Sequence, residues 1–208
     1  MMMLDRKTGK IYHGTTCWHG WRHGWQPAGG MPPDLEQVTA RVALAASQER
    51  TPRTGLPIGV IGPKVATADQ CHTAETVGAM IADMNVPLFC GGKSGVMEAA
   101  CKGAKSRNGL TIGLLPDDEW NVANEYVDIP LASGIGPSRN AIIARACPVL
   151  IAVGGEYGTL TEMAFGLHFN RTVIGLETAP TVKGALTAKT AEEAVELAAS
   201  AYLGTIPN

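Results

Sequence analysis

Three glycine-rich turns carry the residues in this chain that are best suited to binding an anion. Gly62-Pro63, the run 91–95 (GGKSG) and the run 154–159 (GGEYGT) each follow a short apolar segment. Glycine lets the backbone turn sharply and leaves its N–H groups unhindered. A helix that begins at such a turn adds partial positive charge. The turns therefore predict a phosphate-binding site, with the phosphate at the helix that begins in 154–159.

The expected ligand contacts come from these turns. They are Gly62, Gly91, Gly92, Lys93, Ser94, Gly154, Gly155, Glu156, Tyr157, Gly158 and Thr159. Lys93 ranks low among them because loop lysines are commonly solvent-exposed. None of the turns is a Walker loop or a complete GxGxxG motif, so an ordinary ATPase or dehydrogenase is not indicated. The structural alternative is that the glycines only permit tight turns and close packing.

Two charged residues near the third turn could take part in catalysis. Glu162 lies three residues beyond Thr159, so its carboxylate can reach the rim of the phosphate site. There it could stabilise the oxocarbenium-like state of N-glycoside hydrolysis and activate water. Arg139 begins a predicted helix, where a cation is disfavoured unless an anion such as phosphate compensates it. The structural alternatives are a carboxylate that only complements the helix dipole and a surface arginine lying over its helix.

Short apolar runs alternate with amphipathic segments from residue 56 onward, which is typical of a parallel sheet with crossover helices. The expected strands are 57–61, 86–90, 110–115, 126–131, 149–153 and 172–176, and the expected helices are 68–84, 95–107, 138–146, 159–169 and 191–202. The fold class is therefore α/β, with a single Rossmann-like, doubly wound parallel sheet over residues 56–208. In such a sheet the glycine turns all meet outside the carboxyl ends of the strands.

Residues 1–55 form an N-terminal arm of different character, rich in tryptophan and histidine. A hairpin is expected around residues 5–12 and a short helix over 35–48, capped by Asp34. Cys17, His19 and His23 lack the complete spacing of a zinc site, so no metal site is expected. The arm tryptophans are expected to pack on the domain or on a partner subunit, the latter because tryptophan is common at interfaces. They are Trp18, Trp21 and Trp25.

Charge and composition exclude several classes of protein. The chain has 208 residues with 17 Lys and Arg against 19 Asp and Glu, so it has no basic stripe for nucleic acid, and we do not expect nucleic acid as a partner. No apolar run approaches the ~20 residues needed to cross a bilayer, and no secretory signal is visible, so no membrane contact and a cytoplasmic location are expected. The odd count of five cysteines predicts free, buried thiols.

Two motifs resemble the LOG superfamily, the lysine decarboxylase-like Rossmann proteins. They are GGKSGVMEAACKGAK at 91–105 and SRN at 138–140 followed by GGEYGTLTE ending at Glu162. The resemblance spans residues 56–178. This group includes cytokinin-activating nucleoside 5'-monophosphate phosphoribohydrolases and a branch of molybdenum-cofactor carrier proteins. The segments GVMEAACKGAK, TIGLLP and VDIPLASGIGPSRN resemble the carrier branch more closely.

The resemblance implies roles for the charged pair. In the phosphoribohydrolases a catalytic Arg and Glu stand 23 positions apart, as Arg139 and Glu162 do here. Arg139 would contact the phosphate or ribose, and Glu162 would face the glycosidic bond. Asn140 stands where the hydrolases have Lys, and Val153 where they have Pro, which weakens the catalytic assignment. The carriers keep the same Arg and Glu, so the pair does not separate an enzyme from a carrier.

Two functions follow as hypotheses. The main one is hydrolysis of the N-glycosidic bond of a nucleoside 5'-monophosphate, with no cofactor required. The alternative is non-catalytic binding of the molybdenum cofactor, a pterin with a terminal phosphate. Both predict a small phosphorylated ligand, and the resemblance implies a homodimer or higher homo-oligomer. A relative of single-strand DNA-processing proteins is disfavoured because it would need basic grooves with stacking aromatics.

Overall fold

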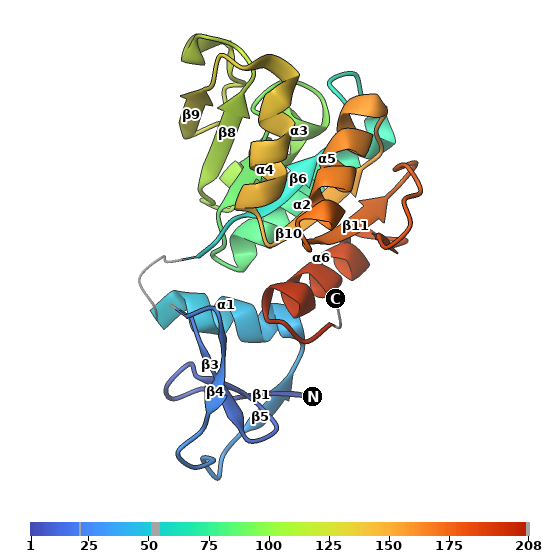
Figure 1. Ribbon diagram of the computed structural model, residues 1–208. Coiled ribbons are helices and arrows are strands. Elements are labelled where there is room, and N and C mark those ends of the chain that lie inside the picture. Colours follow the sequence, from blue (N-terminus) through green and yellow to red (C-terminus); the bar gives the residue numbers. More distant parts are fainter. Residues whose placement is uncertain (21, 51–54, 207–208) are drawn as a thin grey trace.

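A computed structural model describes residues 1–20, 22–50 and 55–206, which form one large parallel sheet and one small antiparallel sheet (Figure 1). The large sheet has the order β12-β11-β10-β6-β7-β8-β9, and each neighbouring pair is parallel. Its strands are β6 (Ile58–Ile61), β7 (Leu88–Cys90), β8 (Thr111–Leu115), β9 (Ile129–Ala132), β10 (Val149–Val153), β11 (Thr172–Leu176) and β12 (Leu186–Thr187). The predicted Rossmann-like α/β fold is confirmed.

Helices cover both faces of this sheet. On one face lie α2 (Ala68–Asp83), α3 (Val96–Ser106) and α6 (Ala191–Tyr202); on the other lie α4 (Asn140–Ala146) and α5 (Tyr157–His168). The central strands β6 and β10 are wholly buried because both of their faces are covered. Strand order reverses between β6 and β10, and this is where ligands bind in open α/β sheets.

The sheet differs from the prediction at β7, β9 and β12. The strand expected at 86–90 begins at Leu88. The strand expected at 126–131 begins only at Ile129, because the chain before it is held by Thr111 instead of a strand ladder. The Thr111 hydroxyl donates to the Tyr126 carbonyl over 2.6 Å, and the Thr111 N–H donates to the Asp128 carboxylate over 3.0 Å. The two-residue strand β12 was not predicted, since a segment so short has no detectable periodicity.

Two helix starts also differ. Tyr157, not Thr159, begins α5, so Thr159 lies inside the helix and is buried there instead of capping it. The helix expected over 138–146 is divided into a 3-10 turn, η2 (Gly136–Arg139), and α4. Both shifts bring residues of the predicted site into the first turns of helices.

The arm folds as a five-stranded antiparallel sheet followed by α1 (Ala40–Arg50). Its strands are β1 (Met2–Leu4), β2 (Ile11–His13), β3 (Thr16–His19), β4 (Gly24–Pro27) and β5 (Glu36–Val38). The predicted hairpin is present as β1 and β2. The helix predicted from 35 was wrong at its start, because residues 36–38 pair with β1 and Arg6 binds the Glu36 carboxylate.

The start of α1 is capped by Thr39 and from the domain, not by Asp34. The N–H of Val42 donates to the Thr39 hydroxyl over 3.4 Å. The N–H groups of Ala40 and Arg41 donate to the two carboxylate oxygens of Glu196 in α6, over 2.7 and 3.3 Å. The contact with Glu196 is invisible in the local sequence, whereas Thr39 was a local capping signal that the prediction did not use. The carboxylate fastens the arm to the domain through the orphan donors of a helix end.

The arm tryptophans that the structure describes pack on the domain, as expected. The indole N–H of Trp25 donates to the Leu203 carbonyl over 2.6 Å, and the ring of His23 lies 4.7 Å from that of Tyr202. Trp18 packs edge-on against both His23 and Trp25. Trp21 lies outside the described residues. Figure 1 shows the arm at the end of the large sheet where β6 begins, away from the carboxyl ends of the strands.

All five cysteines are free thiols, and three of them are buried. Within the described ranges, no helix combines the length and hydrophobicity that a membrane span requires.

Candidate ligand-binding site

A cavity of about 370 Å³ opens at the carboxyl ends of β6 and β7, beside the first turn of α5. It therefore lies at the reversal of strand order that the fold predicts as a binding position. Its volume falls in the range of small-molecule sites.

The structure brings about half of the predicted site residues to this cavity. Those that line it are Gly62, Gly91, Arg139, Glu156, Gly158, Thr159 and Glu162. The predicted residues that do not line it are Gly92, Lys93, Ser94, Gly154, Gly155 and Tyr157. The turns that follow β6, β7 and β10 therefore line one cavity, together with Arg139 and Glu162.

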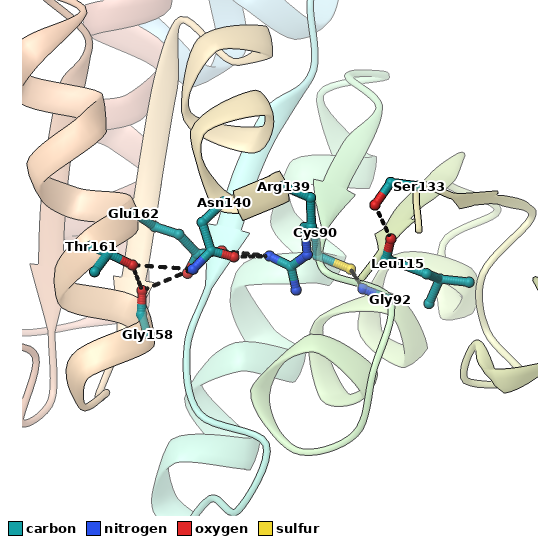
Figure 2. A network of polar contacts seen from close by, with 9 residues as sticks. All are labelled: Cys90, Gly92, Leu115, Ser133, Arg139, Asn140, Gly158, Thr161 and Glu162. Atoms are coloured by element: carbon teal, nitrogen blue, oxygen red, sulfur yellow. Dashed lines mark hydrogen bonds and ion pairs between the residues drawn. The ribbon is translucent and has the colours of Figure 1, made fainter. Parts of the chain in front are cut away.

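Arg139 and Glu162 form a buried ion pair in the wall of the cavity (Figure 2). Nη1 of Arg139 donates to Oε1 of Glu162 over 2.9 Å, and the two side chains are 7% and 8% exposed. The same Nη1 donates to Oδ1 of Asn140 over 2.6 Å. Arg139 in η2 and Glu162 in α5 are 23 positions apart in the sequence. They are in direct contact because η2 and α5 lie at the same edge of the sheet.

Asn140 connects this arginine to the first turns of α5. Its amide nitrogen Nδ2 donates to the Thr161 hydroxyl over 3.1 Å, and that hydroxyl donates to the Gly158 carbonyl over 2.7 Å. The amide group therefore uses its oxygen on the guanidinium and its nitrogen on the helix. This arrangement fixes the orientation of Arg139 relative to the turn that was predicted to hold phosphate.

The rest of the Arg139 guanidinium is free. Among the described residues, the buried Nε atom has no hydrogen-bond partner, and neither has Nη2. Figure 2 shows Nη2 pointing away from Glu162 and Asn140. It lies against Gly91, at the place that a Cβ atom on this glycine would occupy. A buried cation with unused N–H groups beside a cavity is suited to a charge-assisted hydrogen bond with an anion.

Burial dominates the electrostatics of Glu162. Removal from water raises the pKa of its carboxyl to about 7, against the opposing attraction of Arg139. Only Oε1 accepts a hydrogen bond within the described part of the chain. Glu162 therefore stands close to the balance between its charged and neutral forms at neutral pH.

The third glycine turn shapes the start of α5. Gly154 and Gly155 have φ values of +60° and +132°, a region that favours glycine, and Gly155 packs directly against Thr159. The first N–H groups of an α-helix have no partner within the helix. Because Gly158 and Thr159 line the cavity, the positive end of α5 lies at its wall. Tyr157, by contrast, is 84% exposed and lies outside the lining.

Lys93 and its neighbours hold the second glycine turn in place. Nζ of Lys93 pairs with the Asp117 carboxylate over 3.0 Å, and the Lys93 carbonyl accepts from the Asn124 amide over 2.9 Å. The Ser94 hydroxyl donates to the Lys64 carbonyl over 3.2 Å. These contacts leave the Lys93 ammonium engaged outside the cavity.

Several lining residues were not predicted. They are Ile61, Pro63, Lys64, Val65, Met97, Pro116, Pro137 and Asn140. Lys64 was detectable, because it is a cation that directly follows the first glycine turn. Pro116 directly follows a predicted strand, so its place at the same edge of the sheet was also detectable. Asn140 was noted only as a departure from a family motif, and its contacts require the folded chain.

Comparison with known proteins places this geometry in context. The model of the SLOG cluster4 family matches residues 55–203. An uncharacterized protein of Archaeoglobus fulgidus is 39% identical over 140 residues, which are 67% of this chain and 92% of that one.

Two solved structures are similar in fold and in sequence. The molybdenum cofactor binding protein from the phototrophic bacterium Rippkaea orientalis is 35% identical with a TM-score of 0.65, over 69% of this chain and 94% of that one. The molybdenum cofactor carrier protein from Chlamydomonas reinhardtii is 33% identical with a TM-score of 0.63, over 70% of this chain and 98% of that one.

Proposed function

Because this chain belongs to the SLOG cluster4 family, we propose that it binds the molybdenum cofactor through the cofactor's terminal phosphate and holds it without cleaving it. Molybdenum is cargo in this function, carried by the pterin. Among the described residues, no group of three or more His, Cys, Asp and Glu side chains is arranged to hold a metal ion.

The observation that carries this proposal is the half-used guanidinium of Arg139. Nη1 is occupied by Glu162 and Asn140, while the N–H groups of Nη2 have no partner in the described chain. A phosphate in the cavity could accept from this nitrogen and from the first N–H groups of α5. Both donors are fixed in place by the fold, which reduces the entropy lost on binding.

The same geometry favours carriage over hydrolysis. Oε1 of Glu162 is engaged by Arg139, so within the described residues only Oε2 is left to face a ribose. Asn140, in the position of the hydrolase Lys, is bound to Arg139 and to α5. The names of the two solved neighbours support the same interpretation.

Hydrolysis of nucleoside 5'-monophosphates remains the second candidate, because Arg139 and Glu162 do line one cavity. The two functions are separated by incubating the chain with a panel of nucleoside 5'-monophosphates and measuring the free base by chromatography. We expect no release above the rate in buffer. Release by the wild-type chain that Glu162→Gln reduces ~10²-fold or more would establish the enzyme and refute the carrier function.

The homodimer expected from the sequence stays a prediction. Exposed apolar side chains lie on the two helices of one face, Ile142 on α4 and Leu160 and Phe165 on α5. A second copy that packed on these helices would bury them beside the cavity.

A further inference from the structure

Glu162 is the buried carboxylate of the cavity wall. Its Oε1 atom accepts one hydrogen bond from Arg139, and Oε2 has no partner among the described residues. A buried, ionised carboxylate is normally stabilised by several donors. Here a single donor, which is shared with Asn140, holds the charge.

Among the residues that the structure describes, Arg139 is the one cation that pairs with Glu162. Arg139 of η2 binds it directly, and Asn140 at the start of α4 binds the same Nη1 atom. The buried Cys90 thiol at the end of β7 interacts electrostatically with both members of the pair, while β10 contributes only apolar side chains. Two further charged side chains line the cavity, the exposed Lys64 after β6 and the exposed Glu156 before α5. The two cations and the two carboxylates that line the cavity therefore give it a formal net charge of zero before a ligand binds.

A phosphate monoester brings up to two negative charges into this balanced cavity. To bind at Nη2 of Arg139 it must come close to the carboxylate that shares the same guanidinium. Two negative charges in a poorly solvated site repel each other strongly. The acid with the higher pKa is then protonated, which removes one of the two charges. In this cavity that group is Glu162.

Building on the proposed function, we infer that Glu162 takes up one proton from solvent when a phosphate-bearing ligand binds. Arg139 then has the phosphate as its ion-pair partner in place of the Glu162 carboxylate. The proton adds to a carboxylate oxygen, no covalent bond in the ligand changes, and Arg139 stays charged throughout. Glu162 would then act as a proton-linked switch for loading and release.

The electrostatics of the free site fit this exchange. Burial has already raised the pKa of Glu162 to about 7, and a bound anion raises it further. Below pH ~7 the carboxyl is mostly protonated before binding, so little proton uptake occurs. Above pH ~7, binding of the ligand includes protonation of Glu162. Ligand affinity then falls by up to about tenfold per pH unit, until the pH reaches the pKa that Glu162 has in the complex.

Proton uptake can be measured directly by titration calorimetry. The probe is a pterin that carries a phosphomonoester, titrated at pH 8 in two buffers of different ionisation enthalpy. The ligand phosphate, with a pKa of ~6, is already a dianion at this pH. For the wild-type chain we expect uptake of ~0.9 proton per ligand bound, the fraction of Glu162 ionised one unit above its pKa.

Two variants assign the proton. Glu162→Gln mimics the protonated form, so it should take up no proton and bind about tenfold more tightly than wild type at pH 8, with the difference vanishing at pH 6. Glu125→Gln, an exposed carboxyl in the loop before β9, should show the uptake of wild type.

The outcomes separate this inference from the function on which it rests. Binding by the wild-type chain without proton uptake, or uptake that persists in Glu162→Gln, would overturn the inference and leave the binding function intact. Absence of any binding by the wild-type chain would overturn the proposed function and this inference with it.

Discussion

Replacing Arg139 with alanine is expected to weaken binding of a phosphate-bearing ligand by ~2 to 3 kcal/mol, which is roughly 30- to 150-fold. The substitution removes the only buried cation in the lining of the cavity. It also removes the hydrogen-bond partner of the Asn140 side-chain oxygen. Affinity measured by titration calorimetry at pH 6.5 checks this expectation, because Glu162 is then mostly neutral.

Loss of Arg139 also leaves Glu162 buried without a partner, and this can lower stability independently of the ligand. The double variant Arg139→Ala/Glu162→Gln separates the two effects. It has no unpaired buried charge, but it still lacks the arginine contact with the phosphate. Lys93→Ala is the matched control: its ammonium pairs with Asp117 outside the cavity, so affinity should change by less than about threefold. Affinity that is equal in Arg139→Ala and wild type would remove Arg139 from the binding site.

Gly91→Ala is expected to reduce ligand affinity by at least ~10-fold while the fold is retained. The backbone at Gly91 does not have a positive φ, so alanine is allowed there by conformation. The obstacle is space: the new Cβ would overlap Nη2 of Arg139 and lie 2.8 Å from the Met97 sulfur. The guanidinium must therefore move away from the cavity wall, and overpacking of this kind destabilises by ~1 to 3 kcal/mol.

The comparison for this variant is Gly29→Ala in the arm, where an added Cβ meets nothing within 4 Å. Thermal melting and ligand affinity measured for both variants distinguish a local displacement of Arg139 from general destabilisation. If Gly91→Ala melts at a lower temperature but binds the ligand as tightly as wild type, then the placement of Arg139 against Gly91 is wrong.

The large sheet was predictable because buried parallel strands are continuous apolar runs, and VLIAV at β10 and TVIGL at β11 have this pattern. Turns that follow such strands must meet at one edge, so the contribution of Gly62, Gly91 and Gly158 to one cavity followed from topology. Long-range pairings were not predictable in this way. The strand β5 depends on β1, and the start of α1 depends on a carboxylate in α6.

The candidate site was predictable in its residue types but not in its contacts. Spacing along the chain gave Arg139 and Glu162 as a pair, yet it could not show that they bind each other instead of two parts of a ligand. Lys93 was expected near the ligand because it follows a glycine pair, but Asp117, 24 positions further along, engages its ammonium. A side chain's partner depends on which loops meet at the edge of the sheet, and local sequence does not record this.

The central claim is that the cavity at Arg139 holds the molybdenum cofactor intact. The most direct measurement is to incubate the purified chain with the cofactor without oxygen, desalt it, and quantify molybdenum and pterin bound per chain. The account predicts about one of each on the wild-type chain and, because affinity falls ~30-fold or more, little of either on Arg139→Ala. A wild-type chain that retains neither, or an Arg139→Ala chain that retains as much as wild type, would contradict it.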